Sequence, residues 1–390
     1  MTFYKPSLKN IKLFYISSFL DSFWPCLPFW IIYFSQITGS FTLAMSLATI
    51  DNLTTTFLEV PTGILSDKFK RKTVTCLGAL SVLIAACLYS VANSYLVLVM
   101  ASVFYGLYVA LMSGNNEALI FDTLKENHLQ NKYHKVMGKI QGYGSLAFGT
   151  SALVGSGIVW LYGIRETFYV VALVSFLLLL VSLNLHEPEI HTSKINDNPF
   201  KHFSQSIKHL WKNKRLRYLT IATGMDYGVG YAAYSFMNVF FNQFVPTWVL
   251  GALRTVSYFL GSFSYFLSYK ISTAIGYTKT IMTFVGLNYV INLLSVLANC
   301  VLSPFIKTVD NLTNGIVGPA QDTLLQQEFT DKQRATMGSV VSLFRSLIYS
   351  VSSLLIGIVA DLCSEYVSLL VIYITLFLLL PIYYKGLKAK

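Results

Sequence analysis

The chain has 390 residues, of which 54% are hydrophobic and only 12% are charged, and its mean hydropathy is +0.56. A soluble domain carries about a quarter charged residues, so this composition excludes an ordinary soluble protein and indicates a polytopic membrane protein. The formal charge of +11 raises the question of a nucleic-acid partner. The basic residues gather in alternate loops, however, so no nucleic-acid partner is expected.

Apolar stretches of about 20 residues are long enough to cross a bilayer as helices, and twelve are predicted along the chain. They lie near residues 11–36, 41–66, 73–93, 95–121, 137–162, 165–186, 216–243, 246–270, 277–298, 302–327, 336–361 and 364–385. The predicted fold is an all-α polytopic membrane protein with twelve transmembrane helices.

The positions of the basic residues predict how the chain is oriented. Of the 29 Lys and Arg residues, all except Arg165, Arg254, Lys307 and Arg345 fall in the two ends or in alternate loops. Loops on the cytoplasmic side are enriched in Lys and Arg, so both termini are expected in the cytoplasm. The five cysteines show no metal or disulfide spacing, and the first span is too long for a cleaved signal peptide.

The least hydrophobic segment, near the midpoint, predicts a joint between two halves. Asn198 and Pro199 form a helix start, and apolar residues follow at helical spacing with lysines between them. This pattern predicts an amphipathic helix on the cytoplasmic leaflet, although a solvated linker is the alternative. The expected divisions are an N-terminal bundle over 1–186, a linker over 187–215 and a C-terminal bundle over 216–390.

A weak internal repeat supports this division. At an offset of 200 residues, the sequences Asp122-Thr123-Leu124, Met137-Gly138 and Gly157-Ile158-Val159 recur in the second half. Three matches in one register place helices 4 and 5 on helices 10 and 11. The sequence therefore predicts two pseudo-symmetric bundles of six helices, a design found in secondary transporters.

A dense charged segment, Gly63 to Lys72, separates the second and third spans and is expected to form a tight loop at the membrane surface. With Glu59 before it, this segment resembles the loop between helices 2 and 3 of major facilitator superfamily transporters, Gly-x-Leu-x-Asp-Arg-x-Gly-Arg-Lys. Lys68 and Lys70 depart from that pattern. The resemblance implies the twelve-helix fold of that family and a bacterial, drug-efflux-like transporter.

The resemblance also implies a conformational latch, with a solvated surface loop as the alternative reading. Asp67 would face the cytoplasmic start of helix 11, and Arg71 would pair with Asp122 at the end of helix 4. Carboxylates favour helix N-termini, and arginine forms directional bonds with carboxylates. The expected latch residues are Gly63, Asp67, Arg71, Lys72 and Asp122.

Ionisable residues inside the predicted spans are candidates for function. Each costs about 2.5–3.5 kcal/mol at the bilayer centre, so they must face protein or a wet cavity. Asp21 and Asp226 are each read either as a proton-coupling site or as a structural partner of an arginine. Lys307 either pairs with Asp310 or extends to the outer surface. The full set is Asp21, Glu59, Glu117, Asp226, Arg254, Lys307, Asp310 and Arg345.

Aromatic residues near these charges indicate the kind of substrate. Aromatic walls with a buried carboxylate suit amphipathic, often cationic molecules, although most aromatics simply pack. Amide side chains such as Asn115 and Asn116 could instead bind hydroxyl groups. The aromatic candidates for the cavity are Trp24, Trp30 and Tyr231, with Phe23, Phe29, Tyr33, Tyr105, Tyr108, Tyr227, Tyr234 and Phe236.

The expected function is secondary active transport by alternating access, with proton-coupled efflux of amphipathic or hydrophobic small molecules. Uptake of a small organic solute is the alternative. A membrane enzyme or a channel is a less favoured class, since no catalytic or metal constellation and no repeated pore motif is visible.

The glycines of helix 5 lack the Gly-Pro pair of antiporters, which favours close packing as their role. No nucleotide motif occurs, so no cofactor is expected beyond a proton or ion gradient. The protein is expected to be a monomer in a bacterial plasma membrane.

Overall fold

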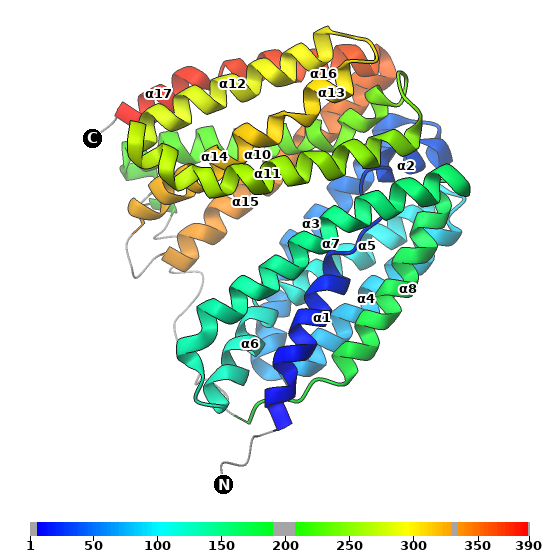
Figure 1. Ribbon diagram of the computed structural model, residues 1–390, viewed down its shortest axis with the longest axis vertical. Coiled ribbons are helices and arrows are strands. Elements are labelled where there is room, and N and C mark those ends of the chain that lie inside the picture. The colour runs from blue at the N-terminus through cyan, green and yellow to red at the C-terminus, as the bar shows by residue number, and fades with distance from the viewer. Residues whose placement is uncertain (1–5, 190–206, 209, 330–333, 389–390) are drawn as a thin grey trace. The chain divides into compact units, whose positions relative to one another are not determined.

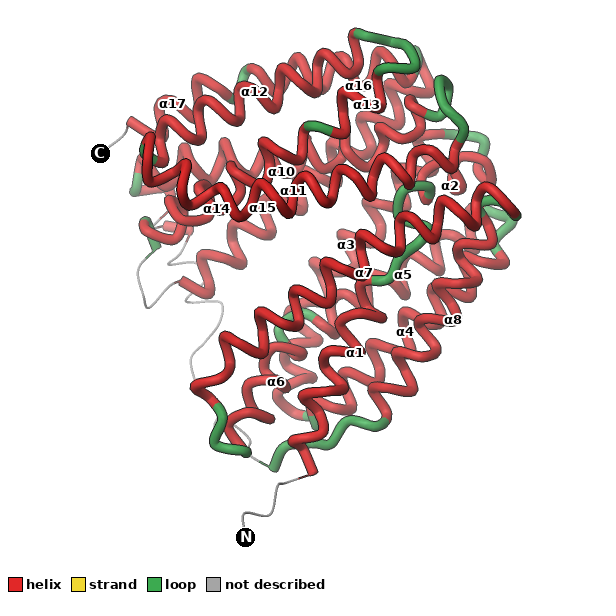
Figure 2. The backbone as a smooth tube through the Cα atoms, in the orientation of Figure 1, coloured by secondary structure: helices red, strands yellow, loops and turns green. Residues whose placement is uncertain are grey.

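This structure, a computed structural model, describes residues 6–189, 207–208, 210–329 and 334–388. Every regular element in these residues is helical, and no strand occurs among them (Figure 2). Each of the twelve spans expected from the sequence overlaps one helix or two consecutive helices. Within the same residues, seven segments are long and apolar enough to cross a membrane. The prediction of an all-α membrane fold is therefore confirmed.

The chain forms two compact units, and the first comprises Met1–Thr38 and Ile50–Asn196. Its helices are α1 (Asn10–Ser22), α2 (Trp30–Thr38), most of α3 (Phe41–Lys68), α4 (Arg71–Val91), α5 (Tyr95–Met112), α6 (Asn115–Glu126), α7 (Tyr133–Leu161) and α8 (Arg165–Leu183), with short 3-10 turns at Pro6–Lys9 and Gln130–Lys132. Within this unit, α4 packs against α5 and α8, and α1 packs against α7 and α8 (Figure 1).

The second unit comprises Gly39–Thr49 and Asp197–Lys390, so the first turns of α3 belong to it. Its helices are α10 (Lys214–Phe241), α11 (Thr247–Ile275), α12 (Tyr277–Leu297), α13 (Ser303–Thr308), α14 (Asp310–Gln327), α15 (Arg334–Leu362), α16 (Glu365–Phe377) and α17 (Leu380–Lys388). In this unit, α14 packs against α11 and α12, and α10 packs against α15 and α17 (Figure 1).

The first expected span is not one continuous helix, because α1 ends at Ser22 and α2 begins only at Trp30. Pro25 has no N–H to donate to the carbonyl of Asp21, four residues earlier. The indole Nε1 of Trp24 donates to that carbonyl instead, at 2.7 Å. Two prolines in this stretch therefore open a break of seven residues within the expected span.

The charged segment after Pro61 is also different from the expected loop. Helix α3 continues through Pro61 and Gly63 as far as Lys68, and α4 begins at Arg71. Only Phe69 and Lys70 separate the two helices, so the prediction of a loop over Gly63 to Lys72 is wrong. Asp67 and Lys68 instead lie at the end of α3, Lys70 lies in the connection, and Arg71 and Lys72 begin α4.

The expected amphipathic helix of the linker lies mostly outside the described residues, since its start at Asn198 and Pro199 falls within residues 190–206. The described end of this segment leads to α10, where the Asn213 side chain accepts a hydrogen bond from the Leu216 amide at 3.0 Å. An asparagine at this position satisfies one of the free N–H groups at a helix start.

The start of α3 is held by a carboxylate at the far end of α15. The Asp361 side chain accepts hydrogen bonds from the hydroxyl of Ser40 at 2.6 Å and from the amides of Phe41 at 2.7 Å and Thr42 at 2.9 Å. Close approach of the backbones requires Gly357, because a Cβ atom there would lie 2.7 Å from the Cα atom of Thr42. A residue 320 positions away in sequence thus caps this helix.

Candidate functional site

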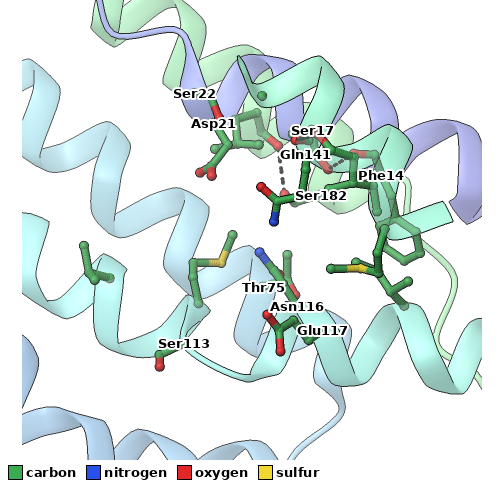
Figure 3. A pocket seen from close by; sticks show the side chains of 18 of the residues that line it. Phe14, Ser17, Asp21, Ser22, Thr75, Ser113, Asn116, Glu117, Gln141 and Ser182 are labelled. Carbon is green, nitrogen blue, oxygen red and sulfur yellow. Dashed lines mark hydrogen bonds between the residues drawn. The ribbon is translucent and has the colours of Figure 1, made fainter. Parts of the chain in front are cut away.

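A cavity of about 610 Å³ lies within the first unit. Figure 3 shows Asp21, Asn116, Glu117 and Gln141 around the same space. The described lining contains the carboxylates of Asp21 and Glu117 but no Lys, Arg or His. The charged side chains of the described lining are therefore both acidic. Its other polar lining residues are Ser17, Ser18, Ser22, Thr75, Tyr108, Ser113, Ser145 and Ser182, and its apolar lining residues include Phe14, Val109, Met112, Ile120, Met137, Ile140, Phe148, Leu178 and Leu185.

Asp21 lies in the last turn of α1, and its side chain contacts one neighbouring phenol. The hydroxyl of Tyr108, on α5, donates to Asp21 Oδ1. Tyr108 itself is buried, with 7% of its surface exposed, so the phenol holds the carboxylate from the protein side. The alternative that Asp21 is the structural partner of Arg254 or Arg345 concerns residues of the second unit and stays a prediction.

Glu59 and Glu117 occupy different surroundings. Glu117 is exposed in the first turn of α6 and lines the first cavity. Glu59 is exposed on α3 and accepts a hydrogen bond from the Ser113 hydroxyl at 3.0 Å, without being part of the first cavity's described lining. Of these two acids, only Glu117 lies beside the same space as Asp21.

A second cavity, of about 450 Å³, lies within the second unit. Its lining combines both signs of charge, with Asp226, Asp310 and Asp322 beside Lys307 and Arg345. Amide groups and aromatic rings complete the described wall, which includes Tyr227, Tyr231, Tyr234, Tyr265, Asn288, Asn292, Asn311, Asn314, Gln321 and Tyr373. The two cavities therefore differ in the balance of their charges.

The Asp226 carboxylate accepts hydrogen bonds from neutral donors. The phenols of Tyr289 and Tyr383 donate to its two carboxylate oxygens, each at 2.8 Å. Gln321 Nε2 lies 3.4 Å from one oxygen and donates to the Tyr383 hydroxyl at 2.7 Å. No described ion pair joins Asp226 to Arg254 or Arg345. Three donors satisfy this carboxylate, whereas Asp21 has one.

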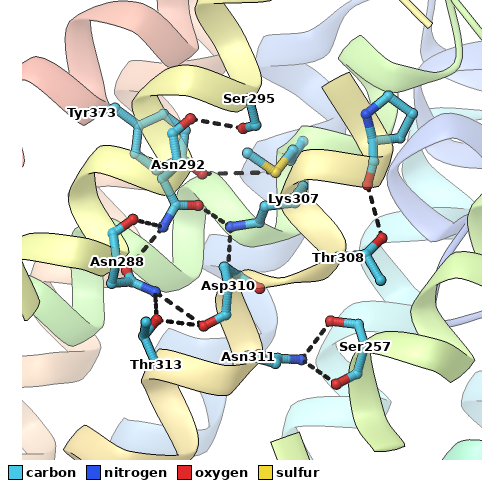
Figure 4. Close-up of polar contacts among 12 residues, drawn as sticks. Ser257, Asn288, Asn292, Ser295, Lys307, Thr308, Asp310, Asn311, Thr313 and Tyr373 are labelled. Carbon is cyan, nitrogen blue, oxygen red and sulfur yellow. Dashed lines mark hydrogen bonds and ion pairs between the residues drawn. The ribbon is translucent and has the colours of Figure 1, made fainter. Parts of the chain in front are cut away.

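Lys307 and Asp310 form a buried ion pair at the break between α13 and α14, with Nζ 2.5 Å from Oδ2 (Figure 4). Lys307 Nζ also donates to Asn292 Oδ1. Only 11% of the Lys307 side chain and 2% of the Asp310 side chain are exposed. The prediction that these residues pair is confirmed, and the alternative that Lys307 extends to the outer surface is wrong.

We expect Lys307→Met to lower the thermal stability of the purified protein strongly, by about 3–5 kcal/mol, because it leaves Asp310 buried without its cation. The double variant Lys307→Met/Asp310→Leu should recover most of this loss. Thermal unfolding followed by tryptophan fluorescence would measure both effects. A double variant no more stable than the single one would show that the ion pair is not the cause.

The two arginines of the second unit lie over tyrosine rings. The guanidinium of Arg254 is 3.7 Å from the ring centre of Tyr234, and that of Arg345 is 5.3 Å from the ring centre of Tyr227. Tyr231 lies between these tyrosines on α10, with its ring stacked on both. Cation–π contacts of this kind stabilise a desolvated guanidinium.

The tryptophans of the first span lie in packed surroundings. Trp24 meets Tyr105 edge-on with ring centres 5.2 Å apart, and Trp30 meets Phe34 edge-on at 5.6 Å. Neither tryptophan is among the described lining of the two cavities. Phe29 is fully buried, at 0% exposure. These three residues therefore pack against other side chains, whereas Tyr227, Tyr231 and Tyr234 line the second cavity.

At the charged segment, Arg71 and Asp122 form an ion pair, with Nε 2.7 Å from Oδ2. The Glu187 carboxylate accepts hydrogen bonds from the backbone amides of Arg71 and Lys72, at 2.9 and 2.7 Å, and so caps α4. Gly63 lies in α3, and the position that a Cβ atom would take there is open space. The side chain of Asp67 falls outside the described residues. The contact expected between Asp67 and the start of the eleventh predicted span (336–361) therefore stays a prediction.

Sequence reasoning missed several of these partners. Glu187 and Asp361 bind helix N-termini, and Tyr289 and Tyr383 complete the surroundings of Asp226. Asp51, inside α3, was also overlooked. These three acids could have been found from the sequence because each lies inside or beside an apolar span. Nothing in the sequence distinguishes the two tyrosines from other tyrosines in the spans.

The comparisons with known proteins agree with this architecture. The family model described as Major Facilitator Superfamily matches residues 13–353. A search of curated proteins found no match. Among solved structures, a mutant of the nucleoside transporter NupG superposes with a TM-score of 0.81 at 13% identity, covering 96% of this chain and 99% of that one.

Two further structures are similar in fold. A bacterial homolog of the human lysosomal transporter Spinster, inward-facing and unoccupied, has a TM-score of 0.76 at 15% identity and covers 99% of this chain and 98% of its own. A variant of the E. coli fucose:proton symporter FucP has a TM-score of 0.60 at 14% identity, with coverage of 98% and 99%. At these identities the likeness is one of fold.

Proposed function

Because the chain belongs to the major facilitator superfamily, we propose that it is a secondary active transporter that exchanges protons for a small amphipathic organic cation by alternating access. It is a multi-pass membrane transporter rather than an enzyme. The observation that carries the proposed exchange is the first cavity, where Asp21 and Glu117 are the ionisable groups of the described lining. A cavity with two carboxylates and no basic lining residue favours a positively charged solute.

Competition at Asp21 would couple the two fluxes. An ionised carboxylate attracts an ammonium group, whereas a protonated one does not, so a proton and a cationic solute occupy it alternately. Burial favours the neutral form of a carboxyl group, and the Tyr108 phenol keeps the group in place in either state. Alternation of this kind converts a proton gradient into export of the solute.

The remaining wall of the first cavity suits an amphipathic molecule. Apolar side chains such as Met112, Ile140 and Phe148 can contact a hydrophobic body, and serine hydroxyls and the amides of Asn116 and Gln141 can bind polar groups. Binding sites combine apolar contact with a few polar groups that fix orientation.

Uptake of a small polar solute is the second candidate, favoured by the many hydroxyl and amide groups in both cavities. Structures with a similar fold include a nucleoside transporter and a fucose:proton symporter. In that case a proton and the solute would move inward together.

We propose the plasma membrane of a bacterium as the location, with both termini in the cytoplasm and bundles over 1–186 and 216–390 joined by a linker over 187–215. A proton moving inward would gain about 2.3 kcal/mol per 100 mV of membrane potential. The pair of Arg71 and Asp122 would act with Gly63, Asp67 and Lys72 as a latch for one state of the cycle.

Inverted membrane vesicles with an imposed pH gradient test this function. We expect a panel of amphipathic amines to be accumulated only in vesicles that contain the protein, with simultaneous loss of the gradient. Quaternary and primary amines should be compared with neutral analogues of the same size. Gradient-driven loss of preloaded neutral solutes from the same vesicles, without amine accumulation, would favour the uptake reading, and absence of any pH-linked flux would contradict proton coupling.

A further inference from the structure

Arg345 carries its charge beside the second cavity without a close acceptor. It lies within α15 and lines this cavity. Its Nε atom is buried and has no hydrogen-bond partner among the described residues. The nearest described carboxylate is that of Asp322, with Nη2 4.0 Å from Oδ1, which exceeds hydrogen-bond distance. The Asp322 side chain is 69% exposed, so water competes for it.

The guanidinium is nevertheless held in a defined position. It lies over the ring of Tyr227 at 5.3 Å, and this ring stacks on Tyr231 with ring centres 5.6 Å apart and planes inclined by 10°. Stacking uses the flat face of a guanidinium and leaves the N–H groups at its edge available. The ring therefore fixes the orientation of Arg345, while its Nε–H still has no acceptor among the described residues.

The other carboxylates of this cavity already have partners. Asp226 accepts hydrogen bonds from Tyr289 and Tyr383, and Asp310 pairs with Lys307. A charged donor inside a membrane protein is costly when it has no acceptor, and an unsatisfied buried donor therefore needs a partner to account for it. The missing acceptor at Arg345 is best supplied from outside the protein.

We propose that Arg345 binds the carboxylate of the transported solute, with Asp322 as a weak internal competitor that the solute displaces. The planar fork of a guanidinium matches the two oxygens of a carboxylate. This inference rests on the proposed transport function and narrows its substrate class to organic amines that also carry a carboxylate group.

Acetate is the simplest probe of this site. Thermal unfolding of the detergent-purified chain is followed while acetate replaces chloride at constant ionic strength, and acetamide serves as the neutral isostere. A ligand that binds the folded protein raises its melting temperature in a saturable way. We expect half of the maximal shift at roughly 1–10 mM acetate and no saturable shift with acetamide.

Three variants identify the binding group. Arg345→Gln should raise the half-saturating acetate concentration at least tenfold, and Arg345→Lys, which keeps the charge but not the fork, should raise it less. Asp322→Asn should lower it, because the competing carboxylate is removed. Arg217→Gln, at a half-buried arginine near the start of α10 that donates to the Trp211 carbonyl, is the matched control and should behave as wild type.

An acetate response that is absent in wild type, or unchanged in both Arg345 variants, would overturn this assignment. Proton-linked amine flux is measured separately in vesicles with the same wild-type protein. Intact flux without an acetate response would reject only the carboxylate site, whereas absent flux would reject the transport proposal whatever acetate does.

Discussion

Asp21→Asn is expected to reduce amine accumulation in inverted vesicles to passive equilibration, with a roughly 10–100-fold loss of affinity for the cation. Asparagine has the shape of aspartate and can still accept the Tyr108 hydroxyl bond, but it neither attracts an ammonium group nor exchanges a proton. The measurement is the ratio of internal to external amine at a fixed pH gradient.

Two companion variants sharpen this test. Glu166→Gln changes a half-buried acid in the first turn of α8, outside the described lining of both cavities, and should leave accumulation unchanged. Asp226→Asn should keep coupling, because three neutral donors already surround that carboxylate. Accumulation that survives in Asp21→Asn but is lost in Asp226→Asn would transfer the coupling role to Asp226.

Arg71→Met should destabilise the protein by about 3 kcal/mol. Only 3% of the Asp122 side chain is exposed, so removal of Arg71 takes a charge partner away from a buried carboxylate. The double variant Arg71→Met/Asp122→Leu should recover most of the loss, since replacing both members of a buried pair with apolar groups is often neutral. Thermal or denaturant unfolding of the purified protein measures the cycle.

The control for this cycle is Lys72→Met, one position away on α4. Lys72 bonds to Glu187 through its backbone amide, which the substitution keeps, so its effect should stay within about 0.5 kcal/mol. If the double variant is as unstable as Arg71→Met, loss of the ion pair does not explain the instability.

The fold was largely predictable because local composition alone identifies a membrane span. About 20 apolar residues suffice to identify one, and the expected spans overlap the helices found. Interruptions depend on local hydrogen bonds and were harder to predict. The break after Ser22 needs two prolines and the Trp24 indole together, whereas α3 passes through Pro61 without ending.

For the candidate site, sequence revealed the charges but not their partners. Asp21 and Asp226 stood out because a carboxylate inside an apolar span is rare. Tyr289 and Tyr383, which distinguish the two, lie 63 and 157 residues from Asp226 in the chain. Such contacts depend on how helices pack, and a tyrosine in a span has many possible orientations.

The carboxylate cap at the start of α3 has a consequence for spectroscopy. The first amides of a helix have no partner within it and normally exchange with solvent quickly. Here the amides of Phe41 and Thr42 donate to Asp361, so their deuterium uptake reports directly on whether that contact is made. These two backbone amides therefore report on separation between the ends of α3 and α15 without any attached probe.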